Sequence, residues 1–356
     1  MSVAVSAPLE RLLKEDSETQ PEAFPNREGG YFDVYKNMKR VLSEKFYSVA
    51  GAGLAKDSHR FTKHDISHVD DVIHTAGRML GFESAASTPV RRDKLEPFEV
   101  FVLLTAILLH DAGNAIARDG HERSVGKIFK EISAATTLVS LEKKVITSIA
   151  RAHGGKLANG DKDTIPNLIT EDAPKIGGFR VHARRLAALL RLADELSEGP
   201  NRVDHVALAG DAVVSDESVL ANLYCRCINP SIDYSGSVFQ LSFHVEKEDL
   251  NRVFTRLDGR EMTFIDYIAE RLEKCECERR YCNRYLAGFA SYNRMSVKLF
   301  ILEDDEERLE ASFFFEEKGY PTEIKPSVKD LAENFDGFRL RDKYHLSPTQ
   351  EISLER

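Results

Sequence analysis

The sequence predicts a mainly α protein, with a helical bundle over residues 31–200 and a smaller α+β unit over residues 201–303. Apolar residues recur at helical spacing through almost all of the first region. In the second region, short runs of β-branched and aromatic residues alternate with polar ones between Gly, Asp and Pro. Of the 356 residues, 42% are hydrophobic and 30% are charged, which is the composition of a folded globular chain.

The bundle is expected to centre on one helix. Residues 97–111 are apolar on nearly every side, which predicts a buried helix. Gly-Gly and Gly-Pro act as stop signals for two later helices. The helices that the pattern indicates are 31–46, 66–82, 97–111, 140–155 and 178–199.

The second region is expected to contain strands and one long helix. The predicted strands are 203–210, 223–234, 237–246 and 291–302, and the predicted helix is 263–289. Residues 1–30 are polar and contain Pro and Gly, which indicates a loosely held lead-in. The acidic run at 303–310 is typical of a solvated linker, so residues 304–356 are interpreted as an acidic linker and C-terminal tail.

Charge and cysteine content narrow the classes of function. A formal net charge of -9 argues against a protein whose main function is to bind nucleic acid, because such binding favours an excess of Lys and Arg. No apolar run reaches the roughly 20 residues of a membrane span, and no signal-peptide pattern opens the chain, so we expect a cytoplasmic protein. Cys275 and Cys282 share a helical face while Cys277 points away, which favours reduced thiols over structural zinc.

The apolar run Phe101–Leu109 ends abruptly at His110 and Asp111. Burying a carboxylate without compensation costs several kcal/mol or more, so this pair needs partners or a metal. Other helices also offer one metal-capable residue each, mostly near an end, and packed helices can bring such residues together. The candidate ligands are His68, His110, Asp111, His121, His153 and Asp194.

Each candidate also has an ordinary structural interpretation. A lone His on an amphipathic helix is more often a surface or core residue than a ligand. Asp194 could instead form a helix-end salt bridge with Arg191 or Arg151. The order of the whole set, each member in a helical context, is what favours a metal site. Imidazoles with carboxylates suit Zn, Mn, Fe, Ni or Co.

These residues resemble the HD-domain metal-dependent phosphohydrolase superfamily, whose order is H…HD…D. "SHVDDVI" contains the first His, "LLHDAGN" the HD pair and "LLRLADEL" the closing Asp. His121 and His153 resemble the two extra histidines of members that hold two metals. The resemblance covers roughly residues 59–200 and implies an HD-type helical bundle.

The resemblance implies that Asp111 bridges two metals. His64 and His68 are one turn apart, so either could be the first ligand; we favour His68 and interpret His64 as a group behind the ligands or facing the substrate. Catalytic roles are expected for Asp111, His121 and Glu122. Glu122 could relay protons or simply favour a helix N-terminus.

Three cations near the ligands are candidate phosphate contacts. They are Arg118, Arg151 and Lys156, and ordinary surface charge is the alternative for each.

The expected function is hydrolysis of a phosphoester or phosphoanhydride of a nucleotide, either a nucleoside phosphate or a cyclic or signalling nucleotide, by a phosphohydrolase or phosphodiesterase. The expected cofactor is one or two divalent ions (Mn, Ni, Co, Zn, Mg or Fe). The expected partner is a nucleotide or another phosphorylated small molecule, without membrane or nucleic acid, and the chain could form a homo-oligomer. Two alternatives stay open: a di-iron oxygenase of the same fold, and a nucleotide-binding regulatory module without turnover.

Overall fold

Helix α5 (Pro97–His110) is the centre of the helical part of the molecule. Pro97 occupies its first turn, and Glu96 and Glu99 form a capping box there. The helix is buried from Phe98 to its end. The stretch Pro97–Ala115 is long and apolar enough to cross a membrane, but 94% of it is buried inside the protein, as in the core helix of a globular fold.

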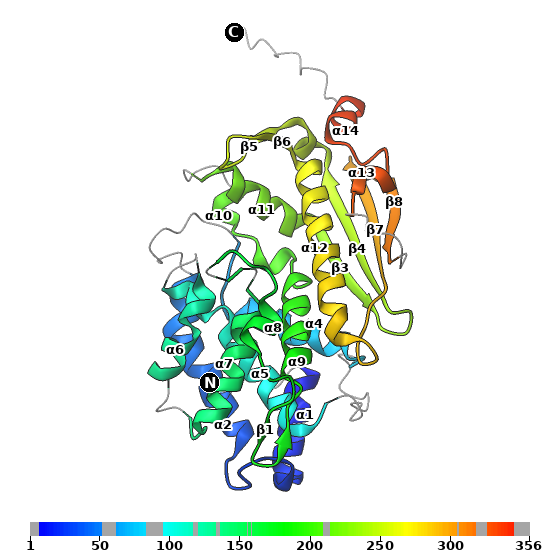
Figure 1. Ribbon diagram of the computed structural model, residues 1–356. Coiled ribbons are helices and arrows are strands. Elements are labelled where there is room, and N and C mark those ends of the chain that lie inside the picture. Colours follow the sequence, from blue (N-terminus) through cyan, green and yellow to red (C-terminus); the bar gives the residue numbers. More distant parts are fainter. Residues whose placement is uncertain are drawn as a thin grey trace.

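The computed structural model describes residues 7–51, 62–82, 95–116, 120–132, 136–154, 156–157, 159–208, 214–304, 306–317 and 326–344. It confirms the predicted fold class, a mainly α bundle with an appended α+β unit (Figure 1). The α-helices around α5 are α1 (Pro8–Thr19), α2 (Tyr31–Leu42), α3 (Ser48–Gly51), α4 (Ile66–Met79), α6 (Val125–Glu131), α7 (Ser140–Ala152), α8 (Thr164–Leu168) and α9 (Ala183–Glu195). Short 3-10 or π turns are η1 (Pro21–Ala23), η2 (Ser43–Tyr47), η3 (Ala112–Ala115), η4 (His121–Ser124) and η6 (Pro200–Arg202), and β1 (Lys175–Ile176) pairs with β2 (Phe179–Arg180).

The N-terminal segment is part of the packed bundle, so its interpretation as a loose lead-in was wrong from residue 8 onward. The leucines of α1 are buried. The buried ammonium of Lys39 on α2 lies 2.7 Å from Glu10 of α1 and 2.6 Å from Asp70 of α4. Tyr35 also donates a hydrogen bond to Glu10. A short polar segment thus joins three helices, and composition alone does not reveal these pairings.

The α+β unit is a four-stranded sheet covered by one long helix. The sheet order is β3-β4-β7-β8, with β4 and β7 parallel and the outer pairs antiparallel. Helix α12 lies along the sheet and connects the two parallel strands (Figure 1). The elements are α10 (His205–Leu208), α11 (Asp216–Cys227), β3 (Ile228–Asp233), β4 (Val238–Glu246), η7 (Lys247–Asn251), β5 (Val253–Thr255), β6 (Glu261–Thr263), α12 (Phe264–Leu286), β7 (Arg294–Glu303), β8 (Glu306–Glu316), α13 (Val328–Leu331) and α14 (Gly337–Lys343).

Three predictions in this region need correction. Residues 205–208 form helix α10 rather than a strand, and the first part of 223–234 belongs to α11. The acidic run at 303–310 is not a linker, because most of it forms β8. Charged residues are tolerated there because β8 is an edge strand and its first four residues, Glu306–Leu309, are all exposed. The five cysteines are free, as expected, and only Cys277 is exposed.

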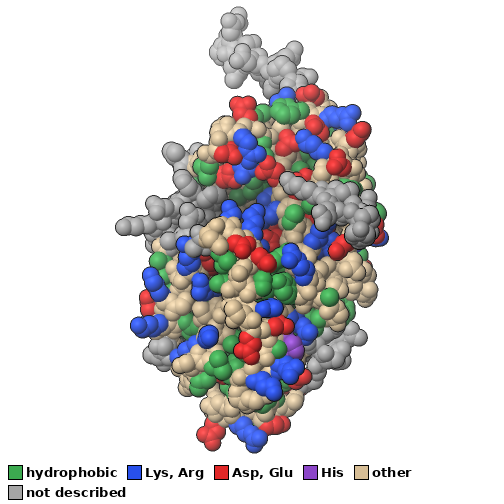
Figure 2. All heavy atoms as spheres, viewed as in Figure 1, with side chains coloured by type: hydrophobic (Ala, Val, Ile, Leu, Met, Phe, Trp, Pro, Cys, Tyr) green, Lys and Arg blue, Asp and Glu red, His purple; other side chains and the backbone are tan. Residues whose placement is uncertain are grey.

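The two parts are joined by specific hydrogen bonds. The backbone N–H of Ile165 donates to the hydroxyl of Tyr281 at 3.0 Å, and the hydroxyl of Tyr292 donates to the carbonyl of Met79 at 2.9 Å. On the face shown in Figure 2, acidic and basic side chains intermingle and hydrophobic ones are scattered in small groups. The α+β unit therefore packs directly on the bundle and brings α12 against α9.

Candidate metal centre

Two groups of imidazoles and carboxylates meet where several helices end. His68 comes from the first half of α4, His110 ends α5, and Asp194 lies in the last turn of α9. Asp111 caps α5, and the remaining pair comes from the start of η4 and the residue after α7. Ligand atoms within 4.8 Å of one another form two clusters: His68, His110 and Asp194; and Asp111, His121 and His153.

In the first cluster, both imidazoles face one carboxylate oxygen. Oδ1 of Asp194 lies 3.0 Å from Nε2 of His68 and 3.6 Å from Nε2 of His110. His68 and His110 are fully buried, whereas Asp194 is partly open to a cavity. Asp194 therefore makes neither of the salt bridges considered as its alternative role, and it lies close to His110 as a shared site requires.

In the second cluster, Asp111 faces two imidazoles. Its Oδ1 lies 3.1 Å from Nε2 of His121 and 3.7 Å from Nε2 of His153, and these two nitrogens are 3.1 Å apart. Its other oxygen, Oδ2, lies 3.6 Å from Nε2 of both His68 and His110. Asp111 thus offers one oxygen to each cluster, which is the arrangement of a carboxylate that bridges two ions.

Backbone carbonyls fix the orientation of two of these imidazoles. Nδ1 of His110 donates to the carbonyl of Ile107 at 2.6 Å, and Nδ1 of His153 donates to the carbonyl of Ala150 at 2.5 Å. Both acceptors lie three residues earlier, in a last helical turn whose carbonyls lack helical partners. When Nδ1 carries the proton, Nε2 of a neutral imidazole presents its lone pair to the cluster.

Gly113 allows His121 to approach Asp111. A Cβ atom at Gly113 would lie 2.1 Å from the backbone carbonyl oxygen of His121. No side chain fits at that distance, so the turn η3 packs against η4 only because residue 113 is glycine. The "HDAGN" sequence therefore positions both its own ligands and a histidine eight residues beyond Gly113.

In the metal-free site, the buried carboxylates and imidazoles shift one another's pKa values. Burial alone lowers the pKa of His110, but Asp111 and Asp194 outweigh it and raise the pKa to about 9. Burial alone raises the pKa of Asp111, but His110 and then His121 hold it well below its usual value. Burial and the positive charge of His110 lower the pKa of His153 to about 4.

The residues fit a divalent metal pair. Nε2 of His110 is completely buried and has no hydrogen-bond partner, although it faces two carboxylates. An orphaned buried nitrogen is costly unless a ligand occupies the space that it faces. Four imidazoles with two carboxylates and no thiolate suit Mn, Fe, Co, Ni or Zn, and this set differs from the thiolate-containing set of a structural zinc site.

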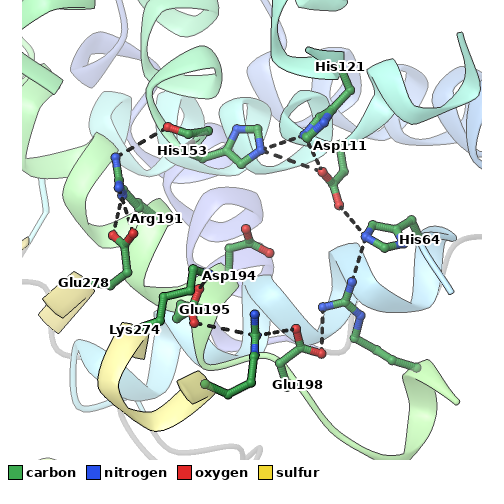
Figure 3. A pocket seen from close by; sticks show the side chains of 13 residues that line it. His64, Asp111, His121, His153, Arg191, Asp194, Glu195, Glu198, Lys274 and Glu278 are labelled. Atoms are coloured by element: carbon green, nitrogen blue, oxygen red, sulfur yellow. Dashed lines mark hydrogen bonds and ion pairs between the residues drawn. The ribbon is translucent and has the colours of Figure 1, made fainter. Parts of the chain in front are cut away.

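A cavity of about 220 Å³ opens onto these ligands (Figure 3). Figure 3 shows His121, His153 and Asp111 on one side and ion pairs of Arg, Lys and Glu on the other. The cavity is lined by His64, Asp111, His121, His153, Gly154, Arg191, Asp194, Glu195, Glu198, Arg202, Arg271, Lys274 and Glu278. The described lining thus contains four permanent cations and no aliphatic, phenyl or phenol side chain.

Helices α9 and α12 form one wall as an antiparallel series of ion pairs. Arg191 pairs with Glu278 through two contacts of 2.6 and 2.8 Å. One turn along, Lys274 lies 2.5 Å from Glu195. Just beyond the end of α9, Glu198 lies 3.3 Å from Arg271. Metal-ligand candidate Asp194 therefore shares a helix with the residues that hold the α+β unit in place.

His64 lines the cavity beside the first cluster but does not belong to it. Its Nδ1 contacts the carbonyl of Thr62 at 2.7 Å, and its Nε2 receives a hydrogen bond from Arg202 at 2.9 Å. Its own neighbour Asp65 caps helix α4 by accepting from the N–H of Ser67. The second His-Asp dipeptide of the chain is thus a helix start with a cavity-facing imidazole.

Two of the three candidate phosphate contacts, Arg151 and Lys156, do not line this cavity. Arg118 lies outside the described residues. Arg151 lines a different surface groove between α6 and α7, and Lys156 is exposed and does not line the cavity. Glu122 is closer to the site, with Oε2 3.9 Å from Nδ1 of His121, which is too long for a hydrogen bond.

The cations that do line the cavity were missed at the sequence level. Arg191, Arg271 and Lys274 recur at helical spacing with Glu in "RLADELSE" and "RLEKCECE", a pattern that also occurs on any solvated helix face. Only the packing of α9 against α12, about 80 residues apart in the chain, distinguishes a cavity wall from a solvated helix face. Local patterning contains no information on that pairing.

The fold and site define a helical bundle with paired His/Asp clusters at its helix ends. A family model described as HD-CE matches residues 58–274, which is more than half of the chain. The chain belongs to the HD-CE family. The match runs beyond residue 200, where the sequence resemblance was expected to stop, and it ends within α12 at the position of Lys274. A search of curated proteins finds no match.

Proposed function

We propose that this protein is a metal-dependent phosphohydrolase that acts on a nucleotide. The observation that carries the proposal is Asp111, whose two oxygens each face a separate cluster of imidazoles. His68, His110 and Asp194 would hold one ion, His121 and His153 the other, and Asp111 both. Bound divalent ions supply Lewis acidity and lower the pKa of water from 15.7 toward about 7.

The residues of the chain prepare the site for this chemistry. The carbonyls of Ile107 and Ala150 keep two imidazoles in the tautomer that binds metal. The Glu122 carboxylate lies beside the distal nitrogen of His121 and favours the protonated form of that nitrogen electrostatically. Arg202 donates a hydrogen bond to Nε2 of His64 and so holds that imidazole at the cavity.

The cation-rich lining supports phosphate ester chemistry over the di-iron oxygenase alternative. Arg271 and Lys274, which have fewer protein partners than the other two lining cations, share the cavity lining with the candidate ligands Asp111, His121, His153 and Asp194. Such side chains bind phosphoryl oxygens well and offer no advantage for activating molecular oxygen. The nucleotide part of the proposal follows from the resemblance to HD phosphohydrolases, and a cytoplasmic location is proposed with it.

The test is a hydrolysis screen of nucleoside mono-, di- and triphosphates and cyclic nucleotides, with Mn, Ni, Co, Mg and Fe supplied in turn. We expect metal-dependent turnover of at least one class, and its loss in Asp111→Ala. Oxygen uptake with Fe, without hydrolysis, would establish the oxygenase alternative. Tight nucleotide binding by metal-replete protein, without any turnover, would establish a regulatory module.

A further inference from the structure

The four cations of the cavity wall are not equivalent. Arg191 is fully engaged, since its guanidinium forms a double contact with Glu278 and donates to the hydroxyl of Thr164 at 2.7 Å. Such bidentate geometry is rigid and specific. Arg191 therefore fastens α9 to α12, and it has little capacity left for a ligand.

Arg202 is also committed to the protein. Its Nη1 lies 3.0 Å from Glu198, its Nη2 donates to His64, and its Nε donates to the carbonyl of Lys63 at 3.3 Å. All three nitrogens of this guanidinium have a partner. Arg202 therefore has a structural role in the cavity wall, because it positions His64.

Arg271 and Lys274 on α12 differ from these two. Both ion pairs of Arg271, to Glu198 and Glu195, run through Nη2 at 3.3 and 3.6 Å, and its Nε has no hydrogen-bond partner. Its guanidinium lies over the ring of Tyr224, 5.2 Å from the centroid, which limits its movement. Lys274 makes one ion pair and is half exposed. Both side chains line the cavity; the unpartnered Nε of Arg271 is itself buried, so any contact with a ligand must come from the terminal nitrogens of Arg271 and the ammonium of Lys274.

The net charge of the cavity depends on metal. The four lining cations are outnumbered by three glutamates and two aspartates, so without metal the lining is net negative by one charge. Two divalent ions would make it net positive by three charges. One phosphoryl group at the metals would neutralise only part of this. Arg271 and Lys274 belong to the same lining, and Figure 3 shows Lys274 across the cavity from Asp111 and His121.

We propose that Arg271 and Lys274 form a second anion subsite, which binds a phosphoryl group adjacent to the one held at the metals. This inference rests on the proposed function and specifies its substrate class as a molecule with a phosphoanhydride, such as a nucleoside di- or triphosphate. Apart from its imidazoles, the described lining offers no ring and no aliphatic side chain for a base, so the proposed recognition is of the phosphate chain.

The test compares imidodiphosphate, which resists hydrolysis, with orthophosphate by calorimetry on the full chain loaded with Mn²⁺. Wild-type protein should bind imidodiphosphate at least about tenfold more tightly, as expected for added charge-assisted hydrogen bonds. Arg271→Gln and Lys274→Gln should each remove most of this preference and leave orthophosphate affinity unchanged. Arg284→Gln, which changes a cation on α12 outside the cavity, is the matched control and should behave as wild type.

Glu195→Gln tests the same anion subsite with a change that should strengthen binding instead of weakening it. This carboxylate pairs with both Lys274 and Arg271. Removing its charge should release donors and strengthen imidodiphosphate binding several-fold, even if the variant is less stable to heat. A purely structural set of ion pairs predicts lower stability and no gain in affinity.

The outcomes separate the two proposals. Equal binding of the two anions by wild type, or unchanged preference in Arg271→Gln and Lys274→Gln, overturns the subsite and leaves phosphohydrolase activity standing. If neither anion binds metal-loaded protein, both proposals fail. Turnover of monoesters alone, in the hydrolysis screen, also overturns the subsite only.

Discussion

At the scale of single residues, Asp111 has the largest consequence. It is buried, it contacts imidazoles of both clusters, and its charge is costly without them. We expect Asp111→Ala to abolish hydrolysis and to reduce bound metal. The metal-free protein should also lose stability, because the variant leaves the buried His110 imidazolium with one carboxylate neighbour instead of two. Metal analysis and chemical unfolding, with and without chelator, measure both effects.

Leu108→Ala is the matched comparison for this variant. Leu108 is fully buried in α5, three residues before Asp111. Its truncation should cost about 2–5 kcal/mol of unfolding free energy and leave activity per folded molecule largely intact. If Asp111→Ala keeps the metal content and the activity of wild type, the carboxylate is not a ligand and the catalytic assignment fails.

The pH dependence of the metal-free protein follows from two histidines. The pKa of His110 is raised from 6.5 to about 9, so its contribution to stability is complete below pH 6.5 and is lost as the pH rises toward 9. The pKa of His153 is lowered from 6.5 to about 4, so its contribution is complete above pH 6.5 and is lost as the pH falls toward 4. Stability should therefore peak near pH 6.5.

Denaturant unfolding from pH 4 to 10 in chelator measures this profile. His110→Asn should flatten the alkaline side, because no imidazolium is then lost. Metal binding at neutral pH should release the His110 proton, which calorimetry in buffers of different ionisation enthalpy detects. A wild-type profile that keeps rising to pH 9 would contradict the assignment of His110 as an imidazolium between two aspartates.

At the scale of elements, the contact between η3 and η4 determines whether the second cluster forms. Gly113→Ala places a methyl group against the backbone of His121 and should displace that residue, while His68, His110 and Asp194 keep their places. We expect the metal content to fall from two ions toward one. Elemental analysis after gel filtration tests this, with Gly126→Ala as control because its added Cβ meets no atom within 4 Å. Unchanged content would show that His121 is dispensable.

Most of the site was predictable from sequence because its ligands follow helix ends. The stop of the apolar helix at His110 and the placement of Asp194 in the last turn of α9 are local features. The strand in the acidic run and the helix at residues 8–19 were not predictable in this way, since each is stabilised by partners distant in sequence. Arg271 and Lys274 were missed for the same reason, because their place in the cavity depends on the packing of α12 against α9.

At the scale of the whole molecule, the α+β unit is joined to the bundle through buried and partly buried groups. Arg191 is buried while bound to Glu278, and Tyr292 is buried while bonded to Met79. Breaking such contacts leaves unpaired groups that are costly to bury. We therefore expect the two parts to unfold together, in a single calorimetric transition.

Glu278→Gln weakens this junction without touching the candidate ligands. It should lower the thermal midpoint of the whole protein by several degrees, because a buried bidentate pair loses one charge. Glu261→Gln, an exposed change in the same unit, serves as the control. Two separate transitions in wild type, or a shift confined to one part, would indicate that the α+β unit folds independently.

If the cavity binds two divalent ions as proposed, its net charge reverses, and metal and substrate would be heterotropic effectors of each other. An anion that binds the loaded cavity better than the empty one must, by thermodynamic reciprocity, increase the affinity for metal by the same factor. The proposed substrate would therefore increase the occupancy of the metal site, and the protein would bind metal most tightly when substrate is present. Under scarce metal, the occupied fraction of such molecules would follow the supply of phosphorylated substrate.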